Sequence, residues 1–398
     1  MLKLYNLIIQ IFSLAIKVHA LFNHKSREWK SGRKDLFNKL NKYITDENET
    51  VWFHCASLGE YEQARELIKK YKQNFQNDKI LLTFFSPSGL NNYKNNTHID
   101  FVSYLPIDTQ KNVKKFLKIV KPKIAIFIKS EFWFNYLNQL SLQKIPTLHI
   151  ASNFNKNDFI LKNNFTRKII EKSSHFFVQD IKSKEILNSY NMTNVTVCGD
   201  PRIDSIISNN KLNIQNEEIK KFCEKKTIII FASVWPEDEH IFVQYIRKNP
   251  QHNYLIAPHE INYCNRISKK LDVELLSNLE NDTEKNILLI NKIGILKNVY
   301  KYCSIAYVGG GFGKGIHNTL EVASNNIPVI FGPNYKKFNE AHELIKQNSA
   351  KSIKNILEFS DFINNQKSWF DIKKTQKYFE ENQGSTQKII EFLIAKKL

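Results

Sequence analysis

Short apolar runs alternate with amphipathic helical patterns along almost the whole chain. Apolar runs of this length, bounded by polar or glycine-containing segments, are typical of strands that are buried on both faces of a sheet. Their alternation with helical patterns indicates a parallel α/β architecture. The runs that we predict to be strands are residues 51–55, 80–84, 101–105, 124–128, 147–151, 175–178, 195–198, 227–232, 253–257, 287–290, 304–308 and 328–331.

The predicted strands fall into two groups, and the segment between them is polar and rich in asparagine. A chain of 398 residues is long enough for two domains. We therefore expect two doubly wound domains, which would hold ligands at the carboxyl ends of their strands, in the crevice between the halves. The expected divisions are an N-terminal helix with its flank at 1–34, a first domain at 35–205, a linker at 206–217, a second domain at 218–375 and a C-terminal helix at 376–398 that braces the first domain.

The charge of the chain narrows the choice of partners. It carries 58 Lys and Arg against 39 Asp and Glu, and the resulting net charge of +19 favours nucleic acid, acidic lipid or a phosphorylated substrate. The sequence has no long basic run, no RNP-like aromatic motif and no zinc-finger spacing, so we expect no nucleic-acid partner. A hydrophobic content of 42% with 12% aromatic residues excludes a disordered chain.

The sequence gives no support to metal chemistry or to a serine nucleophile. The five cysteines never occur in a CxxC spacing, which is typical of reduced core residues in a cytosolic protein. The motifs HExxH and G-x-S-x-G are absent, and the acidic run Glu237-Asp238-Glu239 is interpreted as a solvated helix start. We expect neither a metal ion nor a cofactor.

The first residues of the chain are mostly apolar, but polar side chains recur among them at spacings of three and four. These side chains are Lys3, Asn6, Gln10, Ser13 and Lys17. The spacing predicts an amphipathic helix with one narrow polar stripe and a broad Leu/Ile/Phe face. Residues 24–34 are basic and contain Trp29, a composition suited to anionic lipid headgroups. We predict a membrane anchor on the cytoplasmic side, with a signal peptide and a helix packed on the protein's own core as the alternatives.

A glycine-dense loop follows the predicted strand at 304–308, and a helix is expected to begin near its end. Glycines let backbone N–H groups approach a ligand closely, and a helix N-terminus favours negative charge. The spacing matches neither a Walker loop nor the dinucleotide fingerprint, so the loop predicts a nucleotide-phosphate pocket of another kind. A plain structural turn is the alternative. The candidate residues are Gly309, Gly310, Gly311, Lys314, His317, Asn318 and Glu321, with Glu321 placed to accept from ribose hydroxyls.

Two carboxylates of the first half follow predicted strands and should reach the same edge of a parallel sheet. Glu60 comes after the tight turn that contains Ser57 and Gly59, where a catalytic base could project into the crevice. Glu131 follows the strand at 124–128 and could bind a sugar hydroxyl or orient Glu60. Acidic residues are also common in first helical turns because they suit the helix dipole, which is the alternative for Glu60.

Three further loops of the second half carry polar groups or glycine to the ends of predicted strands. Ser233 could donate to a phosphate or serve as an ordinary N-cap. His259 is either an anion contact or a surface residue. Gly332 and Pro333 end the last predicted strand. Together with the glycine loop, these segments predict a donor site along one edge of the second sheet.

These motifs, taken in order, resemble those of the 3-deoxy-D-manno-oct-2-ulosonic acid (Kdo) transferases of lipopolysaccharide synthesis. The matching landmarks are the N-terminal anchor, Ser57-x-Gly59-Glu60, Glu131-x-Trp133, Ser233, Gly309-Gly310 with His317-Asn318-x-x-Glu321, and Gly332-Pro333. The resemblance implies a GT-B fold, with two Rossmann-like halves facing across a cleft. It also implies the donor CMP-Kdo and a lipid A precursor as acceptor, at the cytoplasmic face of the inner membrane.

The resemblance also implies roles for the candidate residues. Glu60 is expected to be the general base of an inverting transfer, with Ser57 and Gly59 on the acceptor side. Ser233, the glycine loop and Asn318 are expected to hold the phosphate of CMP, and Glu321 its ribose. Pro258-His259-Glu260 stands where many relatives have Pro-Arg-His, so a phosphate-binding arginine is missing, and Lys314 or His259 is the candidate substitute.

Two other functions remain open from the sequence. The first is a membrane-surface GT-B enzyme that uses a UDP-sugar on a lipid acceptor, which UDP should inhibit. The second is a non-catalytic membrane-associated binding protein, which should tolerate the loss of Glu60.

Overall fold

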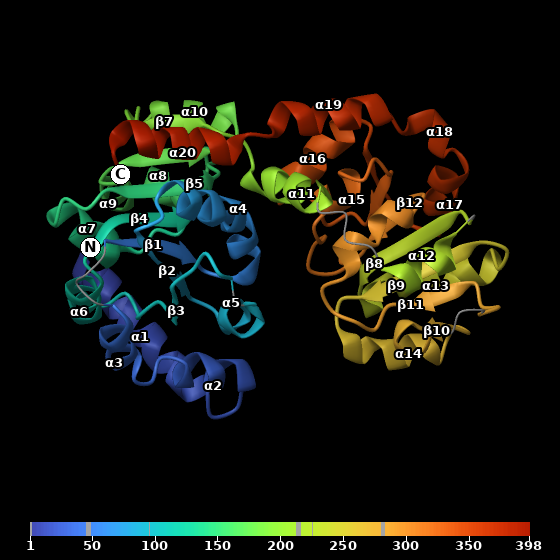
Figure 1. Cartoon of the computed structure of the whole chain (residues 1–398), viewed down its shortest axis with the longest axis horizontal. Helices are drawn as coiled ribbons and strands as arrows, with labels where there is room; N and C mark the ends of the chain where they lie inside the picture. The colour runs from blue at the N-terminus through green and yellow to red at the C-terminus, as the bar shows by residue number, and fades with distance from the viewer. Residues whose placement is uncertain (1, 45–48, 95, 212–215, 225, 280–282) are drawn as a thin grey trace. The chain divides into compact units, whose positions relative to one another are not determined.

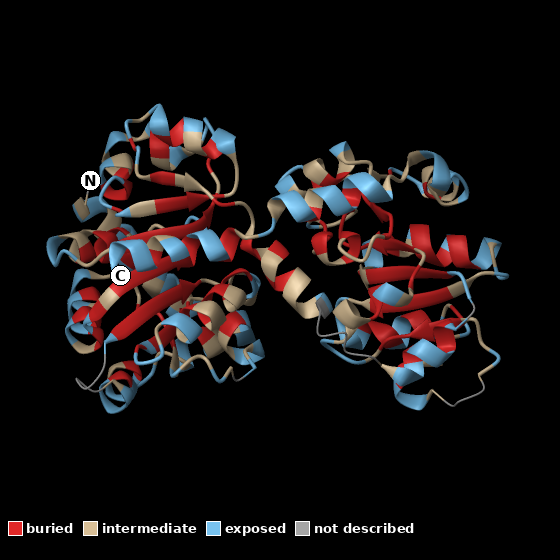
Figure 2. Ribbon diagram, turned by 45° about the horizontal axis from the view of Figure 1, so that its top comes forward, coloured by how far each residue is buried: buried red, intermediate tan, exposed pale blue. Residues whose placement is uncertain are grey.

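The computed structural model describes residues 2–44, 49–94, 96–211, 216–224, 226–279 and 283–398. The chain divides into two compact units: unit 1 comprises Met1–Ser205 and Asn382–Leu398, and unit 2 comprises Ile206–Glu381. Each unit is built on one parallel seven-stranded sheet with helices packed against it (Figure 1). The central strands are buried, while the outer sides of the helices are exposed (Figure 2). The predicted doubly wound α/β class is thus confirmed.

The sheet of unit 1 has the strand order β3-β2-β1-β4-β5-β6-β7. The strand order therefore reverses direction between β1 and β4, which is where doubly wound folds bind their ligands. The strands are β1 (Thr50–Cys55), β2 (Lys79–Phe84), β3 (Phe101–Tyr104), β4 (Pro122–Ile128), β5 (Thr147–Ser152), β6 (His175–Val178) and β7 (Val195–Val197). The helices are α1 (Leu2–His19), α2 (His24–Ser31), α3 (Leu36–Tyr43), α4 (Leu58–Asn74), α5 (Pro87–Asn92), α6 (Gln110–Val120), α7 (Phe134–Leu142), α8 (Phe159–Lys162), α9 (Asn164–Ile170), α10 (Ile181–Asn188) and α20 (Ser385–Lys396). Helix α11 (Pro201–Lys211) begins in unit 1 and ends in unit 2.

Every residue of β1 is buried, because both faces of the sheet are covered. Successive side chains of a strand point to opposite faces. Accordingly, Phe53 belongs to the core formed with α4 and α20, whereas Trp52 belongs to the core formed with α6 and α7. Helix α20 is held at its start by Asp204, whose carboxylate accepts from the backbone amides of Gly384 and Thr386 at 2.6 Å each.

Helix α1 rests on unit 1 through a narrow face. The Tyr5 hydroxyl donates to the buried carboxylate of Asp108 at 2.5 Å, and Asn6 accepts from the side chain of Asn135 at 2.8 Å. Ile9 is buried on the same face. The broad apolar face is exposed instead, and its large side chains are Leu4, Leu7, Ile8, Ile11, Phe12, Leu14 and Val18.

The sheet of unit 2 has the strand order β10-β11-β9-β8-β12-β13-β14, with its own reversal beside β8. The strands are β8 (Ile228–Val234), β9 (Asn253–Pro258), β10 (Glu274–Leu275), β11 (Ile287–Leu289), β12 (Ile305–Val308), β13 (Val329–Phe331) and β14 (Ala350–Ser352). The helices are α12 (Glu217–Cys223), α13 (Glu239–Lys248), α14 (Cys264–Ser268), α15 (Leu320–Ala323), α16 (Asn339–Lys346), α17 (Ile356–Asn364), α18 (Gln366–Trp369) and α19 (Ile372–Asn382), and the 3₁₀ turn η1 spans Pro236–Asp238.

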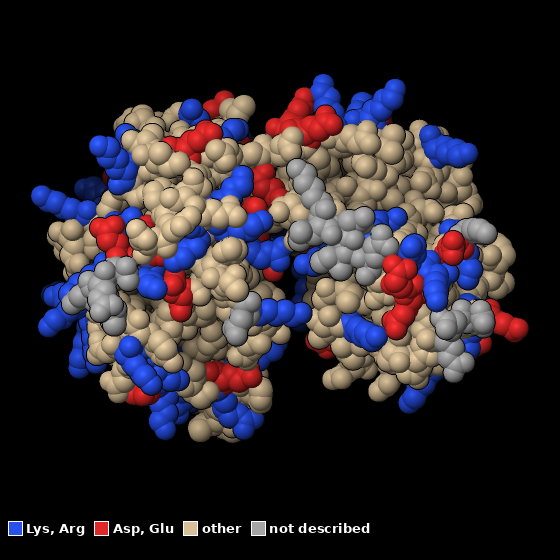
Figure 3. Space-filling model, viewed as in Figure 1, with Lys and Arg blue, Asp and Glu red and all other residues tan. Residues whose placement is uncertain are grey.

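All the predicted strands are present, but two strands of unit 2 were not predicted. The strand β10 has only two residues, and β14 (Ala350-Lys351-Ser352) is a short edge strand without an apolar run. Of the predicted linker, residues 206–211 continue helix α11, and residues 212–215 lie outside the described residues. On the face shown in Figure 3, Lys and Arg side chains are spread over both units and interspersed with acidic ones.

Candidate active site

Glu60 lies in the first turn of α4, directly after the carboxyl end of β1. Its carboxylate reaches back and accepts a short hydrogen bond from the backbone amide of Ala56. Ser57 is the N-cap residue, but its side chain makes no capping hydrogen bond. A Cβ atom at Gly59 would meet only the Ser57 hydroxyl, at 3.9 Å, so the protein itself does not require glycine there. Gly59 is exposed, whereas Glu60 beside it is half-buried.

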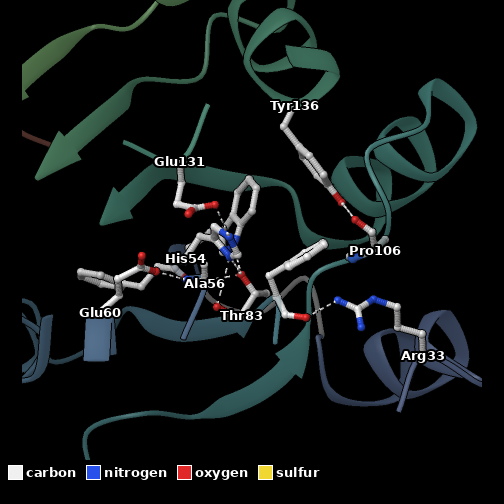
Figure 4. A network of polar contacts seen from close by, with 11 residues as sticks. Arg33, His54, Ala56, Glu60, Thr83, Pro106, Glu131 and Tyr136 are labelled. Atoms are coloured by element: carbon white, nitrogen blue, oxygen red, sulfur yellow. Dashed lines mark hydrogen bonds and ion pairs between the residues drawn. The ribbon is translucent and has the colours of Figure 1, made fainter. Parts of the chain in front are cut away.

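Glu131 follows β4, the strand next to β1, and approaches the same edge of the sheet. Its Oε2 lies 3.9 Å from Nε2 of His54, a residue of β1 that is 0% exposed. Burial lowers the pKa of His54 to about 3, so the ring is neutral at pH 7 and the contact is not an ion pair. Figure 4 shows the Glu131 carboxyl beside the His54 ring and the Glu60 carboxyl directed toward Ala56.

The pKa values of both carboxyl groups are raised above the ordinary value of a glutamate side chain. Burial, and after it the charge of Glu60, raises the pKa of Glu131 to about 7. Burial also raises the pKa of Glu60, against the lowering effect of the Ala56 amide and of the Lys129 ammonium. A carboxylate whose pKa is raised toward neutrality is suited to accept a proton during catalysis. The predicted meeting of Glu60 and Glu131 at one edge is therefore observed, and the charge of Glu60 acts on the pKa of Glu131.

Lys129 belongs to this site, although the sequence assigned it no role. It is exposed at the end of β4, and its charge lowers the pKa of both Glu60 and Glu131. Its backbone is left-handed with a φ of 63°, a conformation that costs energy for a residue with a side chain. Its amide donates to Ile150 at 2.7 Å and its carbonyl accepts from the Ser152 hydroxyl at 3.0 Å, which hold this backbone in place.

The Arg33 guanidinium connects three backbone segments next to the site. Arg33, labelled in Figure 4, donates to the backbone carbonyls of Leu105 at 3.0 Å, Trp29 at 3.1 Å and Phe85 at 2.7 Å. Burial lowers its pKa to about 9. The Phe85 ring in turn packs on Trp133, with ring centroids 4.7 Å apart. The segment after α2 is thus connected through Phe85 to the loop that carries Glu131.

In unit 2, the end of β8 is held to the glycine loop by Asp238. This carboxylate is 0% exposed and accepts from the amides of Trp235 at 2.8 Å and Gly310 at 3.0 Å, and from the Tyr307 hydroxyl at 2.7 Å. The interpretation of Glu237-Asp238-Glu239 as a solvated helix start was wrong for Asp238. The turn η1 folds its carboxylate inward, where it satisfies buried donors.

The glycines of the loop are required by close packing within the protein. A Cβ atom at Gly309 would lie 2.5 Å from the Ser233 carbonyl, and one at Gly311 would lie 2.6 Å from the Gly332 amide. Gly310 has a φ of 88°, and a Cβ there would lie 2.3 Å from the Gly315 carbonyl. The amides of Gly309 and Gly310 already donate to Ala232 and Asp238. These two amides are therefore already occupied by partners within the protein.

The remaining candidate residues gather around the ends of β8, β9, β12 and β13. Ser233 has a left-handed φ of 54° at a register shift of β8. Lys314 is exposed, and Gly332-Pro333 closes on the loop through the Asn334 amide, which donates to Gly311 at 2.9 Å. Asn318 accepts from the Leu320 amide at 3.1 Å. His259 and His317 form a ring stack that is described below.

The helix expected near Asn318 begins at Leu320 and has only four residues. A single helical turn supplies a weak dipole, so little attraction for phosphate comes from this helix. Glu321 lies on it and contributes, after burial, to the raised pKa of the buried Tyr300 hydroxyl. Among the described residues there is no group of three His, Cys, Asp or Glu side chains that could hold a metal ion.

Sequence comparison relates the chain to glycosyltransferases. Residues 31–205 match the family described as 3-deoxy-D-manno-octulosonic-acid transferase (kdotransferase). The chain is 26% identical over 368 residues to the 3-deoxy-D-manno-octulosonic acid transferase of Rickettsia bellii, an alignment that covers 86% of this chain and 87% of that one. It is also 26% identical over 385 residues to a bifunctional glycosyltransferase/methyltransferase of Fusobacterium nucleatum. That alignment covers 89% of this chain and 59% of the Fusobacterium protein, so the chain spans less than two thirds of that relative.

A solved structure shares the architecture at low sequence identity. The UDP-GlcNAc 2-epimerase of Neisseria meningitidis, bound to UDP-GlcNAc, superposes with a TM-score of 0.61 and 17% identity. The match covers 87% of this chain and 100% of the epimerase. It bears on the fold alone, and the predicted GT-B class of two Rossmann-like domains is confirmed.

Proposed function

We propose, on the premise that this chain is a member of the Kdo transferase family, that it moves Kdo from CMP-Kdo to a lipid A precursor during lipopolysaccharide synthesis. The observation that carries this proposal is the meeting of Glu60 and Glu131 at the reversal point of the unit 1 sheet. A proton must leave the acceptor hydroxyl in such a transfer, and this pair has the raised pKa values suited to receive it.

In the proposed reaction, an acceptor sugar hydroxyl attacks the anomeric carbon of Kdo. A new carbon–oxygen bond forms there as the bond to the CMP phosphate breaks, and the configuration of the anomeric carbon inverts. The hydroxyl proton passes to the Glu60 carboxylate, and CMP leaves with the bonding electron pair. Glu131 orients the hydroxyl or Glu60, and Ser57 and Gly59 border the acceptor. The transfer requires no metal ion in this proposal.

The donor is proposed to bind to unit 2. The groups that would hold the phosphate are Ser233, His317, Asn318 and Lys314, and Glu321 would hold the ribose. Support comes from the arrangement of these residues around the strand ends beside the reversal point of the sheet. Gly309, Gly310, Gly311, Gly332 and Pro333 shape this surface through the close packing that the glycines permit.

We place the enzyme at the cytoplasmic side of the inner membrane, with α1 as the element that contacts lipid. Among the described residues, helix α1 is both long enough and apolar enough, by length and composition, to cross a membrane. Its exposed Leu and Ile side chains are not packed against the other described residues of unit 1. Helix α2 and its flank contribute four exposed positive charges, those of Lys25, Arg27, Lys30 and Lys34. Apolar burial combined with cationic attraction to anionic lipid is the usual basis of such binding.

Competition between nucleotides tests the identity of the donor. CMP is expected to inhibit transfer, whereas UDP at the same concentration is not, because the proposed donor site binds a CMP-sugar. Initial rates measured at fixed CMP-Kdo with rising CMP or UDP would check this. Inhibition by UDP with none by CMP would favour the alternative of a UDP-sugar enzyme acting on a lipid.

The pH dependence of transfer tests the pairing of the carboxylates. Glu60 must be ionised to accept a proton, so kcat/KM is expected to fall as the pH drops through the pKa of the pair. The charge of Glu60 raises the pKa of Glu131 to about 7, so Glu60 ionises first and Glu131→Gln should leave the acid limb of Glu60 in place while it removes the ionisation near pH 7 from the profile. The measurement is kcat/KM for both proteins across the acid and neutral range. A Glu131→Gln profile that keeps its ionisation near pH 7 would show that this ionisation does not belong to Glu131.

A further inference from the structure

Three aromatic rings meet at the carboxyl edge of the unit 2 sheet. Trp235 follows β8, His259 follows β9, and His317 lies beyond the glycine loop that follows β12. The rings of Trp235 and His317 are nearly parallel, at 8°, and His259 stacks on both, with centroid distances of 4.4 Å to Trp235 and 4.3 Å to His317. The Trp235 indole nitrogen donates to His317 Nε2 at 2.8 Å.

This hydrogen bond determines which nitrogen of His317 carries a proton. An indole N–H can only donate, so Nε2 of His317 must offer its lone pair. Burial, and after it the neighbouring His259, lowers the pKa of His317 to about 4, so the ring is neutral at pH 7. The single ring proton of His317 must then reside on Nδ1. Within the described residues, no protein acceptor is found for this Nδ1–H.

The two loops that carry these rings are fixed to each other independently of the ring contact. Asp238 accepts from the backbone amides of both Trp235 and Gly310, and the His317 amide donates to the Gly309 carbonyl at 3.4 Å. Gly309 also lies so close to the Ser233 carbonyl that no side chain fits between them. The indole and the imidazole are therefore held in register before any ligand arrives, which lowers the cost of binding.

The ring stack also bears on the phosphate-binding arginine that the chain lacks at Pro258-His259-Glu260. Burial lowers the pKa of His259, so this residue is not a cation at neutral pH and cannot replace a guanidinium as a charge. A neutral ring can still donate one hydrogen bond to an anion, and bonds to charged acceptors are stronger than those between neutral groups. In this edge of unit 2, a fixed N–H donor is available at His317.

We propose that Trp235 is a positioning residue that holds His317 as an Nδ1–H donor to the phosphate of the nucleotide donor. This inference rests on the proposed function, because it assigns the phosphate to the same edge of unit 2. Phosphate recognition at this position would then depend on a neutral hydrogen-bond donor with a fixed tautomer. His259 covers the hydrogen-bonded pair and limits the access of water to it.

The first test is an NMR measurement of the histidine tautomer on the full chain, labelled with ¹⁵N at histidine. His317 is expected to show a protonated Nδ1 and an unprotonated Nε2 without any nucleotide. Trp235→Phe keeps an aromatic ring but lacks the N–H, so its His317 should lose this fixed tautomer. A wild-type His317 with the proton on Nε2 would overturn the inference, whatever the protein transfers.

The second test compares two substitutions of His317. The Asn side chain places its amide nitrogen at the same bond distance from Cβ as Nδ1, whereas Gln places it as far away as Nε2. His317→Asn should therefore bind CMP more tightly than His317→Gln, by about tenfold, and Gln should lose up to about a hundredfold relative to wild type. His252→Gln, before the opposite end of β9, is the matched control and should bind as wild type does.

Both CMP and UDP would be titrated, so that failure of the inference and failure of the proposed function are distinguishable. Binding of UDP but not CMP would contradict the proposed donor, and the Asn and Gln variants would then be compared with UDP. Equal affinities of His317→Asn and His317→Gln for the bound nucleotide would overturn the inference. So would a wild-type His317 Nδ1–H resonance that neither nucleotide moves.

Discussion

Glu60→Gln is expected to lower kcat for Kdo transfer by about 10²–10⁴-fold, the usual contribution of a positioned general base. Gln has nearly the same shape as Glu, and its amide oxygen can still accept from the Ala56 amide, so the turn between β1 and α4 should be preserved. CMP affinity should stay unchanged, because the proposed donor site belongs to unit 2. The measurements are kcat by product mass and CMP affinity by calorimetry.

Glu62→Gln is the matched control, because Glu62 lies on the same helix with a side chain that is 47% exposed and pairs with Arg65 at the surface. It should retain the activity of the wild-type protein. A Glu60→Gln protein with wild-type kcat would remove Glu60 from the role of base. A loss of CMP affinity in that variant would instead point to a general disturbance of the fold.

The combined substitution of Leu7, Ile11 and Leu14 by Asp is expected to abolish binding to anionic vesicles. These side chains share one face of α1 and are 52%, 58% and 62% exposed. Burial of one such side chain is worth about 1.5–3 kcal/mol, so losing three lowers the affinity for lipid by more than about 10³-fold. Activity on an acceptor dispersed in detergent should persist, because the narrow face that binds Asp108 and Asn135 is unchanged.

The control for α1 is a triple Asp variant at three exposed apolar residues elsewhere in unit 1: Leu142, Phe159 and Ile181. It matches the change in charge and in apolar area but leaves α1 intact, so it should cosediment with vesicles as the wild-type protein does. If the α1 variant still cosediments, or if both variants detach equally, α1 is not the element that contacts lipid.

Most of the fold could be predicted from the sequence because its strands are buried on both faces. Continuous apolar runs such as residues 51–55 and 124–128 therefore marked central strands clearly. The edge strands β10 and β14 were missed because they are short and lack such runs. The resemblance to Kdo transferases, predicted from an ordered set of motifs, is confirmed by the family match and by the curated relatives.

Part of the candidate site could be predicted from the sequence. The rest depends on contacts between residues that lie far apart in the sequence. Parallel strands end at one edge, so Glu60 and Glu131 could be expected to meet from their positions alone. The fully buried Asp238 was mistaken for a solvated residue because its neighbours Glu237 and Glu239 are acidic. The pairing of Trp235 with His317 depends on the way β8 and β12 lie side by side, which no local pattern encodes.

The most direct test of the proposed function is the mass of the product formed from CMP-Kdo and a tetraacylated lipid A precursor by the purified full chain, without added metal. The account predicts a product heavier by one or more Kdo units, with CMP released. No increase in acceptor mass, together with no binding of CMP to the folded protein, would contradict it.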